Sequence, residues 1–528
     1  MTLKDATAIV GIGQTAFAKH LPESERALAC RAVLAALDDA GIDPGEVDAL
    51  ASYTMEETDE VELAKAVGFG DLTYFSKVGF GGGGSCATVA HLAAAIAAGQ
   101  ATVGVAWRSR KRGSGPRPWT NTSVQLPTPA QWTRPFGLLR PADEIAMLAR
   151  RYLHEYGATR DHLFNVALAC RNRANRNPAA IMYDRPLTRE MYMTARWISE
   201  PLCLYDNCLE TDGALACVIV GRERARDCRR PPVYVHSAAQ GLPAQHHGMV
   251  NYWNDDPLTG PAWAAARHLW KHADFTPSDV DVAQIYDAFT PLVPLSLEGY
   301  GFCDRRRGRR VHRGGRPGDR RTAAPEHRRR RAQRGLRPRI QPHQRRRQAT
   351  ARHQHLPGPR RRHLPRHRRR RRPDVRPAAP QLNAPRSRPT MLTPVPDADG
   401  APFWEYAARG ELRVQTCADC DEPRFPPRPC CPHCHSFASE WRATSGRGRI
   451  WSYVVPHPPL LPDYAAHAPY VVLLVELADA PRIRLVGNLV SEPGAALGSV
   501  PPDRVRIGAR VQAVFGADGL PQWVLERP

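Results

Sequence analysis

Apolar strands alternate with helical patterns over the first 303 residues. An apolar run at 7–13 is followed by an amphipathic pattern over 25–42, in which Gly41 marks the end of a helix. Strands are predicted at 47–53, 101–107, 213–220 and 281–289, and helices at 87–99, 143–156 and 188–195. This alternation predicts an α/β fold built on a layered, largely parallel sheet.

The pattern changes twice after residue 303. Residues 304–390 contain no Phe, Trp or Tyr and repeat Arg, Pro and His. Because such a composition buries too little apolar surface to offset chain entropy, we expect disorder there. From Met391 an ordinary pattern resumes, and short apolar strands between Pro and Gly turns over 446–528 predict a small β-barrel. We therefore predict domains at 1–303, 391–445 and 446–528, with the Arg-rich segment 304–390 between the first and the second.

The Arg-rich segment also explains the charge of the chain. A net charge of +22 and a pI near 9.9 would ordinarily indicate a nucleic-acid-binding protein. Residues 304–390, however, hold 32 Arg against four acids, a net of +28, which leaves −6 for all other residues. Nucleic acid binding stays an alternative that rests on this segment alone and predicts strongly salt-dependent binding. The rest of the sequence does not favour nucleic acid as a partner.

The genetic code suggests a second interpretation of this segment. Residues 332–343 can be encoded so that a frame one nucleotide later gives Leu-Ser-Glu-Ala-Tyr-Val-His-Gly-Phe-Asn-Leu, an ordinary globular sequence. GC-rich codons for Gly and Ala also give Arg, Pro and His when they are read out of frame. We therefore interpret residues 304–390 as the product of a frameshift, natural or from sequencing, which bypassed a stop and joined two neighbouring frames.

Targeting signals and cysteine usage predict a cytoplasmic protein. No run of about 18 apolar residues is present, so no membrane span is predicted. The first residues, MTLKDATAIVGIGQ, lack the basic and long apolar regions of a secretory signal. Five of the 13 cysteines lie between Cys417 and Cys434, which suits a reducing compartment with free thiols or bound metal better than a disulfide framework.

The clustered cysteines predict a metal site. Cys417-x-x-Cys420 and Cys431-x-x-Cys434 are two paired knuckles, whose four thiolates suit one tetrahedral Zn²⁺ in a closed, structural site. Cys430 and His435 are spare donors, and the Cys-Pro-x-Cys spacing favours Cys431 over Cys430. Iron remains an alternative occupant, since soft four-sulfur sites accept either metal.

The C-terminal part resembles a known family. The segments FWEYAARGELRVQTC, PPRPCCPHC, SGRGRIWSYVV and RIGARVQAVF are similar to those of a rubredoxin-like zinc ribbon followed by an OB-fold, found beside thiolase-like proteins. OB-folds often bind nucleic acid through aromatic stacking. This resemblance instead implies a role in acyl-CoA metabolism, as a partner domain for a thiolase-like or hydratase-like subunit.

The N-terminal part resembles the thiolase superfamily, in the lipid-transfer-protein branch related to sterol carrier protein x thiolase. The resemblance rests on AIVGIGQTAF, the glycine run GGGGSC before a small-residue helix, TDGALACVIV and AQIYDAFTPLVPLSLEGYGFC. It implies a layered α-β-α thiolase-like fold whose second half is truncated here, a homodimer formed through that domain, and a coenzyme A thioester as substrate.

Two thiolase residues are replaced in this chain. A thiolase needs a nucleophilic Cys at a helix N-terminus and a His or Cys to move protons. Cys86 lies near such a helix, but the cysteine of the family would fall about four residues earlier, near Gly82. Cys86 is therefore either a nucleophile or a small packing residue at a crowded turn. The family's His-Asp-Cys-Phe is Tyr-Asp-Ala-Phe here, at 286–289.

These departures match a subgroup that resembles the steroid side-chain aldolases. Its members cleave a carbon–carbon bond of a β-hydroxyacyl-CoA by retro-aldol chemistry, without a covalent Cys. The resemblance implies a catalytic tyrosine in a Tyr-Asp-x-Phe loop, and Tyr286 matches it. Asp287, the next residue, would orient this loop. The resemblance also implies a second catalytic tyrosine, in a Ser-Glu-Ala-Tyr-Val-His-Gly motif. This motif appears here only in the shifted frame, where its tyrosine falls at the codons of Leu336 and Arg337. A tyrosine can supply the acid or the base of such a step if its pKa is lowered. We expect the activity to be impaired in this chain.

Several alternatives remain open. A thiolytic acetyl-CoA acyltransferase would use Cys86, and a nonenzymatic lipid or acyl-CoA carrier would use neither Cys86 nor Tyr286, which is then a core tyrosine. The basic run from Arg108 to Arg112 either meets CoA phosphates or forms a solvated loop. His246 and His247 either line a pocket or lie in a surface loop.

Overall fold

The computed structural model describes residues 3–54, 56–79, 84–115, 130–246, 249, 251–307 and 391–526. These residues belong to one compact unit of the chain. The disorder and the truncating frameshift predicted for 304–390 fall outside the described residues, apart from residues 304–307. Gly82 and His247 lie outside them as well.

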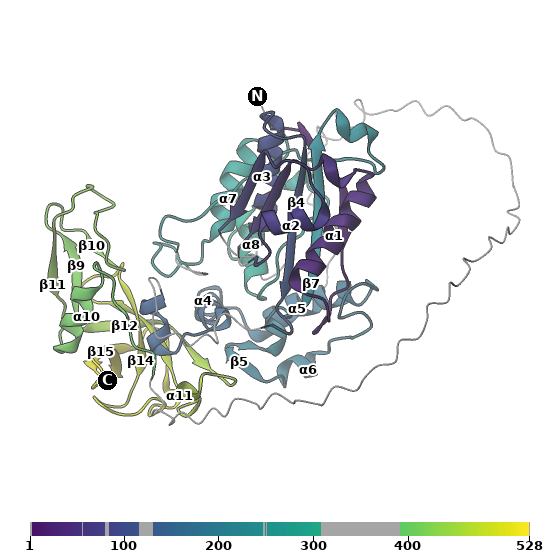
Figure 1. Ribbon diagram of the computed structural model, residues 1–528. Helices are drawn as coiled ribbons and strands as arrows, with labels where there is room; N and C mark the ends of the chain where they lie inside the picture. Colours follow the sequence, from purple (N-terminus) through teal and green to yellow (C-terminus); the bar gives the residue numbers. More distant parts are fainter. Residues whose placement is uncertain are drawn as a thin grey trace, which may run out of the picture. The chain divides into compact units, whose positions relative to one another are not determined.

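A six-stranded sheet forms the N-terminal part, with the strand order β3-β2-β4-β7-β1-β8 (Figure 1). Its strands are β1 (Thr7–Gln14), β2 (Ala49–Tyr53), β3 (Tyr74–Val78), β4 (Val103–Lys111), β7 (Asp212–Gly221) and β8 (Val233–Tyr234). β2 pairs in parallel with β3 and β4, whereas β7 lies antiparallel between β4 and β1. The α/β prediction is confirmed, but a largely parallel sheet is only partly right, because β7 and β8 run against the other four strands.

Helices cover both faces of this sheet and produce the predicted layers. α1 (Glu25–Ala40) and α2 (Glu60–Val67) bury Leu28, Leu37 and Leu63 on one face, and α3 (Ser85–Ala97) buries Leu92 and Ile96 on the other. Successive strand residues point to opposite faces, so each strand supplies both layers. As predicted, α1 ends at Gly41, whose φ of 74° is left-handed and suits glycine.

A second group of elements lies partly between β4 and β7 and partly after β8 in the chain. It comprises α4 (Pro141–Tyr156), α5 (Arg160–Ala174), α6 (Arg189–Met193), β5 (Trp197–Glu200), β6 (Leu202–Cys203), α7 (Pro261–Lys271) and α8 (Leu292–Gly299). The sequence pattern predicted α4 and a longer form of α6, and it missed α5. Among the described helices, none combines the length and the apolar character that crossing a bilayer requires.

The strand predicted at 281–289 does not form. This segment is irregular apart from a bridge between Asn207 and Phe289, and Val282 is 72% exposed. The prediction was wrong because a strand needs neighbours to satisfy its backbone N–H and C=O groups, whatever its own side-chain pattern. Within the described residues no strand lies beside this segment.

The C-terminal part contains two small β structures. α10 (Ala401–Ala408) precedes a three-stranded sheet of β9 (Arg413–Cys417), β10 (Pro423–Arg424) and β11 (Ser439–Ala443). The predicted barrel follows and is confirmed, since five strands close on one another in the order β12-β13-β14-β16-β15-β12, with β14 and β16 parallel. The strands are β12 (Arg447–Pro456), β13 (Val472–Leu477), β14 (Arg484–Leu489), β15 (Arg510–Phe515) and the unpredicted β16 (Pro521–Leu525), and the short helix α11 (Pro462–Ala465) precedes β13.

One continuous apolar core joins this barrel to residues 130–295. It runs from Phe136 and Tyr152 to Leu473 and Trp523. β5 extends the barrel sheet by pairing with the end of β12. The buried Arg140 pairs with Asp143 at 2.7 Å and donates to the carbonyls of residues 198, 457 and 459. The barrel is therefore part of the same packed body as α4 and β5.

Candidate functional site

Tyr286 and Asp287 lie on the irregular segment that leads into α8, and the segment is fixed from one side. The backbone N–H of Cys208 donates to the carbonyl of Ala288 at 2.9 Å. Thr290 donates its N–H to the carbonyl of Asp206 and its hydroxyl to the Asp206 carboxylate, at 3.1 and 2.7 Å. Ala288 and Thr290 are thus held in place although they belong to no sheet.

Asp206 is the centre of this attachment. Its side chain is buried and also accepts hydrogen bonds from the Tyr192 hydroxyl at 2.6 Å and the Cys203 N–H at 2.8 Å. Burial raises the pKa of Asp206, and the donors from Tyr192, Thr290 and Cys203 act in the opposite direction. Sequence reasoning missed Asp206, because a single Asp in LYDNC has no motif around it.

The environment of Tyr286 favours the protonated phenol. Its side chain is 56% exposed. Partial burial raises the pKa of Tyr286 to about 12, the charges of Cys208 and Tyr53 add to the rise, and Arg108 opposes it. The lowered pKa expected of a catalytic tyrosine is therefore not found, because burial outweighs the effect of Arg108, and at neutral pH the phenol carries its proton.

Asp287 faces α5 rather than Tyr286. It is exposed, and it forms a hydrogen bond with the thiol of Cys170. Burial and then the Asp287 charge raise the pKa of Cys170 to about 12. This contact ties the segment to α5.

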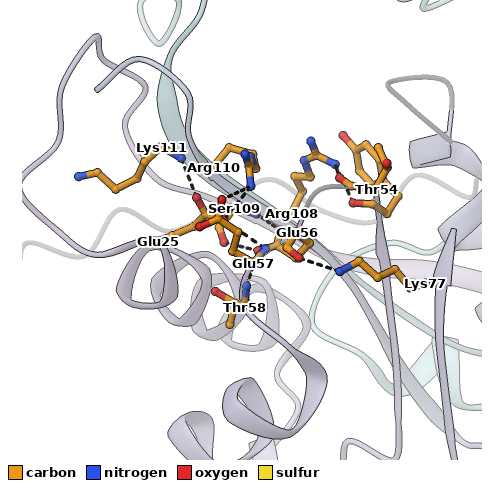
Figure 2. Close-up of polar contacts among 11 residues, drawn as sticks. Glu25, Thr54, Glu56, Glu57, Thr58, Lys77, Arg108, Ser109, Arg110 and Lys111 are labelled. Carbon is orange, nitrogen blue, oxygen red and sulfur yellow. Dashed lines mark hydrogen bonds and ion pairs between the residues drawn. The ribbon is translucent and has the colours of Figure 1, made fainter. Parts of the chain in front are cut away.

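Arg108, on β4, is locked in place beside this segment. Its Nη1 donates to the carbonyls of Tyr53 and Thr54, at 2.7 and 2.5 Å, and its guanidinium carbon lies 4.1 Å from the centre of the Tyr53 ring. Figure 2 shows Arg108 beside Glu56, which accepts from the N–H and the hydroxyl of Ser109 at 2.7 and 3.0 Å. Burial raises the pKa of Glu56 to about 6, against the effect of these hydrogen bonds.

The remaining cations of this run have protein partners too. Arg110 pairs with Glu25 at 3.2 Å and with Glu57 at 3.3 Å (Figure 2). Lys111 donates to the carbonyls of Leu21 and Glu23. Residues 108–111 therefore form part of β4 and its polar network, rather than the solvated loop that was one of the two sequence alternatives.

Cys86 lies in the same neighbourhood. It is exposed and is the second residue of α3, after the N-cap Gly84. Burial raises the pKa of Tyr53, Arg108 opposes the rise, and the charges of Glu56 and of a thiolate at Cys86 add to it. The charge of Tyr53 in turn raises the pKa of Tyr286. Cys86 and Tyr286 therefore both lie within electrostatic range of Tyr53, which sequence reasoning did not single out.

His246 is held by its own loop. Its Nδ1 lies 2.7 Å from Oδ1 of Asn251, and the side chain is half-buried.

The four cysteines of the ribbon converge as predicted. Their sulfur atoms all lie within 4.8 Å of one another, with Cys417 and Cys434 at 3.5 Å and Cys420 and Cys431 at 3.7 Å. Zn–S bonds of about 2.3 Å in a regular tetrahedron would place the sulfurs about 3.8 Å apart. Hydrogen bonds from the N–H groups of the second knuckle lower the pKa of Cys431 to about 6, which favours the thiolate that binds metal. The residues present therefore fit one zinc ion, without Cys430 or His435.

Three segments match known families. Residues 244–320 match the thiolase C-terminal domain-like family. Residues 404–440 match the rubredoxin-like zinc ribbon domain of ChsH2, and residues 441–516 match the C-terminal OB-fold domain of ChsH2.

Curated proteins are similar to the two parts separately. The N-terminal part is 44% identical over 310 residues to a steroid side-chain-cleaving aldolase of Thermomonospora curvata, covering 57% of this chain and 79% of that protein. It is 43% identical over 308 residues to the 17-hydroxy-3-oxo-4-pregnene-20-carboxyl-CoA lyase of Mycobacterium tuberculosis, covering 57% and 80%. A further 126 residues are 41% identical to a probable enoyl-CoA hydratase alpha subunit of Thermomonospora curvata, covering 24% and 36%.

A solved structure is similar to the fold. The chain matches an Ltp2-ChsH2(DUF35) aldolase with 42% identity and a TM-score of 0.56, covering 59% of this chain and 81% of that one.

Proposed function

Since the chain belongs to the family of the steroid side-chain-cleaving aldolases and also carries a ChsH2-type zinc ribbon and OB-fold, we propose that it cleaves a β-hydroxyacyl-CoA with a steroid-like side chain by a retro-aldol reaction. The observation that carries the proposal is Tyr286, which stands where the resemblance to thiolases implies a histidine and lies within electrostatic range of Arg108. A tyrosine there suits proton transfer without a covalent thiol.

The reaction divides into two proton transfers around one bond cleavage. A base removes the proton of the β-hydroxyl group, the bond between Cα and Cβ breaks, Cβ becomes a carbonyl carbon and the electron pair remains on Cα as a thioester enolate. The enolate then takes a proton at Cα. We assign the donor role to Tyr286, because its raised pKa keeps the phenol protonated, and Arg108 adds positive charge beside the developing anion.

The proposed base is the tyrosine of the Ser-Glu-Ala-Tyr-Val-His-Gly motif, which is absent from this chain and appears only when its codons are read in the shifted frame. Losing one proton-transfer group commonly lowers a rate by roughly 10²–10⁴-fold. We therefore expect the chain as it stands to be a slow enzyme. We expect the frame-restored chain to be a fast one.

Zinc and two protein partners complete the proposal. Zinc at the four cysteines would stabilise the ribbon and take no part in the cleavage. β3 has only β2 beside it in the described sheet and exposes Phe75, so we propose that a homodimer forms through this strand when the fold is complete. The similarity to a hydratase alpha subunit supports a hydratase-like partner for the barrel, and we propose a cytoplasmic location.

The test compares the full chain with its frame-restored form on a steroid β-hydroxyacyl-CoA, with products identified by mass spectrometry. The expected products are a ketone or aldehyde and a shortened acyl-CoA, formed without added coenzyme A. Tyr286→Phe should abolish cleavage, whereas Cys86→Ser should retain it. Cleavage of the corresponding β-ketoacyl-CoA that requires free coenzyme A and is lost in Cys86→Ser would support the thiolytic alternative, and tight binding of the β-hydroxyacyl-CoA without turnover would support a carrier.

A further inference from the structure

Arg424, on β10 beside the first cysteine knuckle, is buried without a partner. It is 2% exposed, and none of its Nε, Nη1 and Nη2 atoms has a hydrogen-bond acceptor among the described residues. A guanidinium group has five N–H donors, and burying a charged group without compensation is among the most costly arrangements in a protein. A negative charge must therefore lie close to Arg424 in the working protein.

The strand register directs Arg424 toward the metal ligands. Arg424 pairs directly with Gln415 of the antiparallel neighbour β9, so the two side chains lie on the same face of the sheet. Cys417 lies two residues further along β9 and points to that same face. Arg424 is thus a diagonal neighbour of Cys417 across the two strands, and such neighbours lie roughly 7–8 Å apart.

A second guanidinium lies next to it. Arg428 donates its backbone N–H to Gln415 at 2.9 Å and its Nη2 to Gln245 at 3.0 Å. Burial lowers the pKa of Arg428, the adjacent charge of Arg424 lowers it further, and a thiolate at Cys431 raises it. Two cations therefore share a poorly solvated region whose nearby negative charge is that of the cysteine sulfurs.

No carboxylate balances this pair, since no ion pair joins Arg424 or Arg428 to an acid within the described residues. A divalent metal with four thiolates carries a net charge of −2. We propose that Arg424 and Arg428 are the charge partners of the metal-tetrathiolate centre, which make the ribbon neutral when loaded and strengthen its hold on the metal. This pairing also favours a divalent metal such as Zn²⁺ over ferric iron, whose tetrathiolate would leave one positive charge unbalanced. The inference concerns the ribbon alone and does not depend on aldolase activity.

The test measures zinc affinity of the full-length chain by competition with a chromophoric chelator. Arg424→Met keeps much of the side-chain length and removes the charge. Outer-shell partners of metal ligands typically contribute 10–100-fold to affinity, so we expect the dissociation constant for zinc to rise by at least about 10-fold. The matched control is Arg442→Met on β11 of the same ribbon, since Arg442 is half-exposed and pairs with Asp421 and Glu440. It should change the dissociation constant by less than about 2-fold.

Two further measurements separate charge from packing. Arg424→Lys should keep most of the zinc affinity, and Arg428→Gln should weaken it in the same direction as Arg424→Met. Removing an unbalanced cation should also raise, or leave unchanged, the melting temperature of the zinc-free protein, while lowering that of the zinc-loaded protein. If Arg424→Met lowers both melting temperatures equally with an unchanged zinc dissociation constant, or if Arg424→Lys loses zinc as readily as Arg424→Met, the proposal is wrong. If Arg424→Met does not fold, an unchanged zinc affinity in Arg428→Gln overturns it.

Discussion

The buried carboxyl of Glu56 makes the N-terminal sheet less stable as the pH rises. Glu56 is 5% exposed and accepts hydrogen bonds from the N–H and hydroxyl of Ser109, yet burial raises its pKa from 4.5 to about 6. Between these two values the folded protein binds a proton more tightly than the unfolded chain does. The stability contribution of Glu56 is therefore highest below pH 4.5 and falls until the pH passes about 6.

The size of this effect follows from the shift. A displacement of about 1.5 pH units corresponds to about 2 kcal/mol of unfolding free energy. Glu56→Gln removes the titration and preserves the shape of the side chain. Relative to the wild type, the variant should therefore gain about 2 kcal/mol of stability between pH 4 and pH 7.5. The constant difference between an amide and a carboxyl group cancels, because only the change with pH is compared.

Urea unfolding followed by tryptophan fluorescence at several pH values measures this difference. Glu57→Gln is the matched control for removing a carboxylate from the same loop, because the side chain of Glu57 is 73% exposed. A difference for Glu56→Gln that is independent of pH, or that favours the wild type as pH rises, would refute the reasoning.

Three other outcomes are expected. Metal analysis should find close to one zinc per chain, lost in Cys420→Ser, and a chelator should loosen the C-terminal part first, as seen by limited proteolysis. Arg140→Met leaves Asp143 as an unpaired buried carboxylate and should lower the unfolding free energy by roughly 3–5 kcal/mol in urea; a loss below about 1 kcal/mol would show that the pair is dispensable. The frame-restored chain should cleave a β-hydroxyacyl-CoA roughly 10²–10⁴-fold faster than the chain as it stands, measured by product formation, and equal rates would contradict the role of a second tyrosine.

Local signals account for what the sequence predicted correctly. Gly41 ends α1 because its left-handed backbone favours glycine, and paired Cys-x-x-Cys knuckles have few geometries besides a shared metal. The segment 281–289 shows the limit of such signals, because its side-chain pattern suits a strand that has no neighbours to pair with. Asp206 and Arg424 lay beyond prediction for a related reason: their surroundings depend on Thr290 and Gln415, which meet them only in the fold. The domain boundaries and the catalytic assignment of Tyr286 remain predictions.

The pairing of β5 with β12 has a consequence for how this polypeptide tolerates being divided. Val455 pairs with Glu200, and Arg140 donates to the carbonyls of His457 and Pro459. The N-terminal part, up to residue 307, and the C-terminal part, from residue 391, are therefore held together by contacts that do not depend on the peptide bonds between them. A single protease cut between residues 308 and 390 should therefore yield two fragments that still elute together, as a heterodimer does. The covalent link would then serve chiefly to hold the two parts at a high effective concentration, so that neither has to find the other by diffusion.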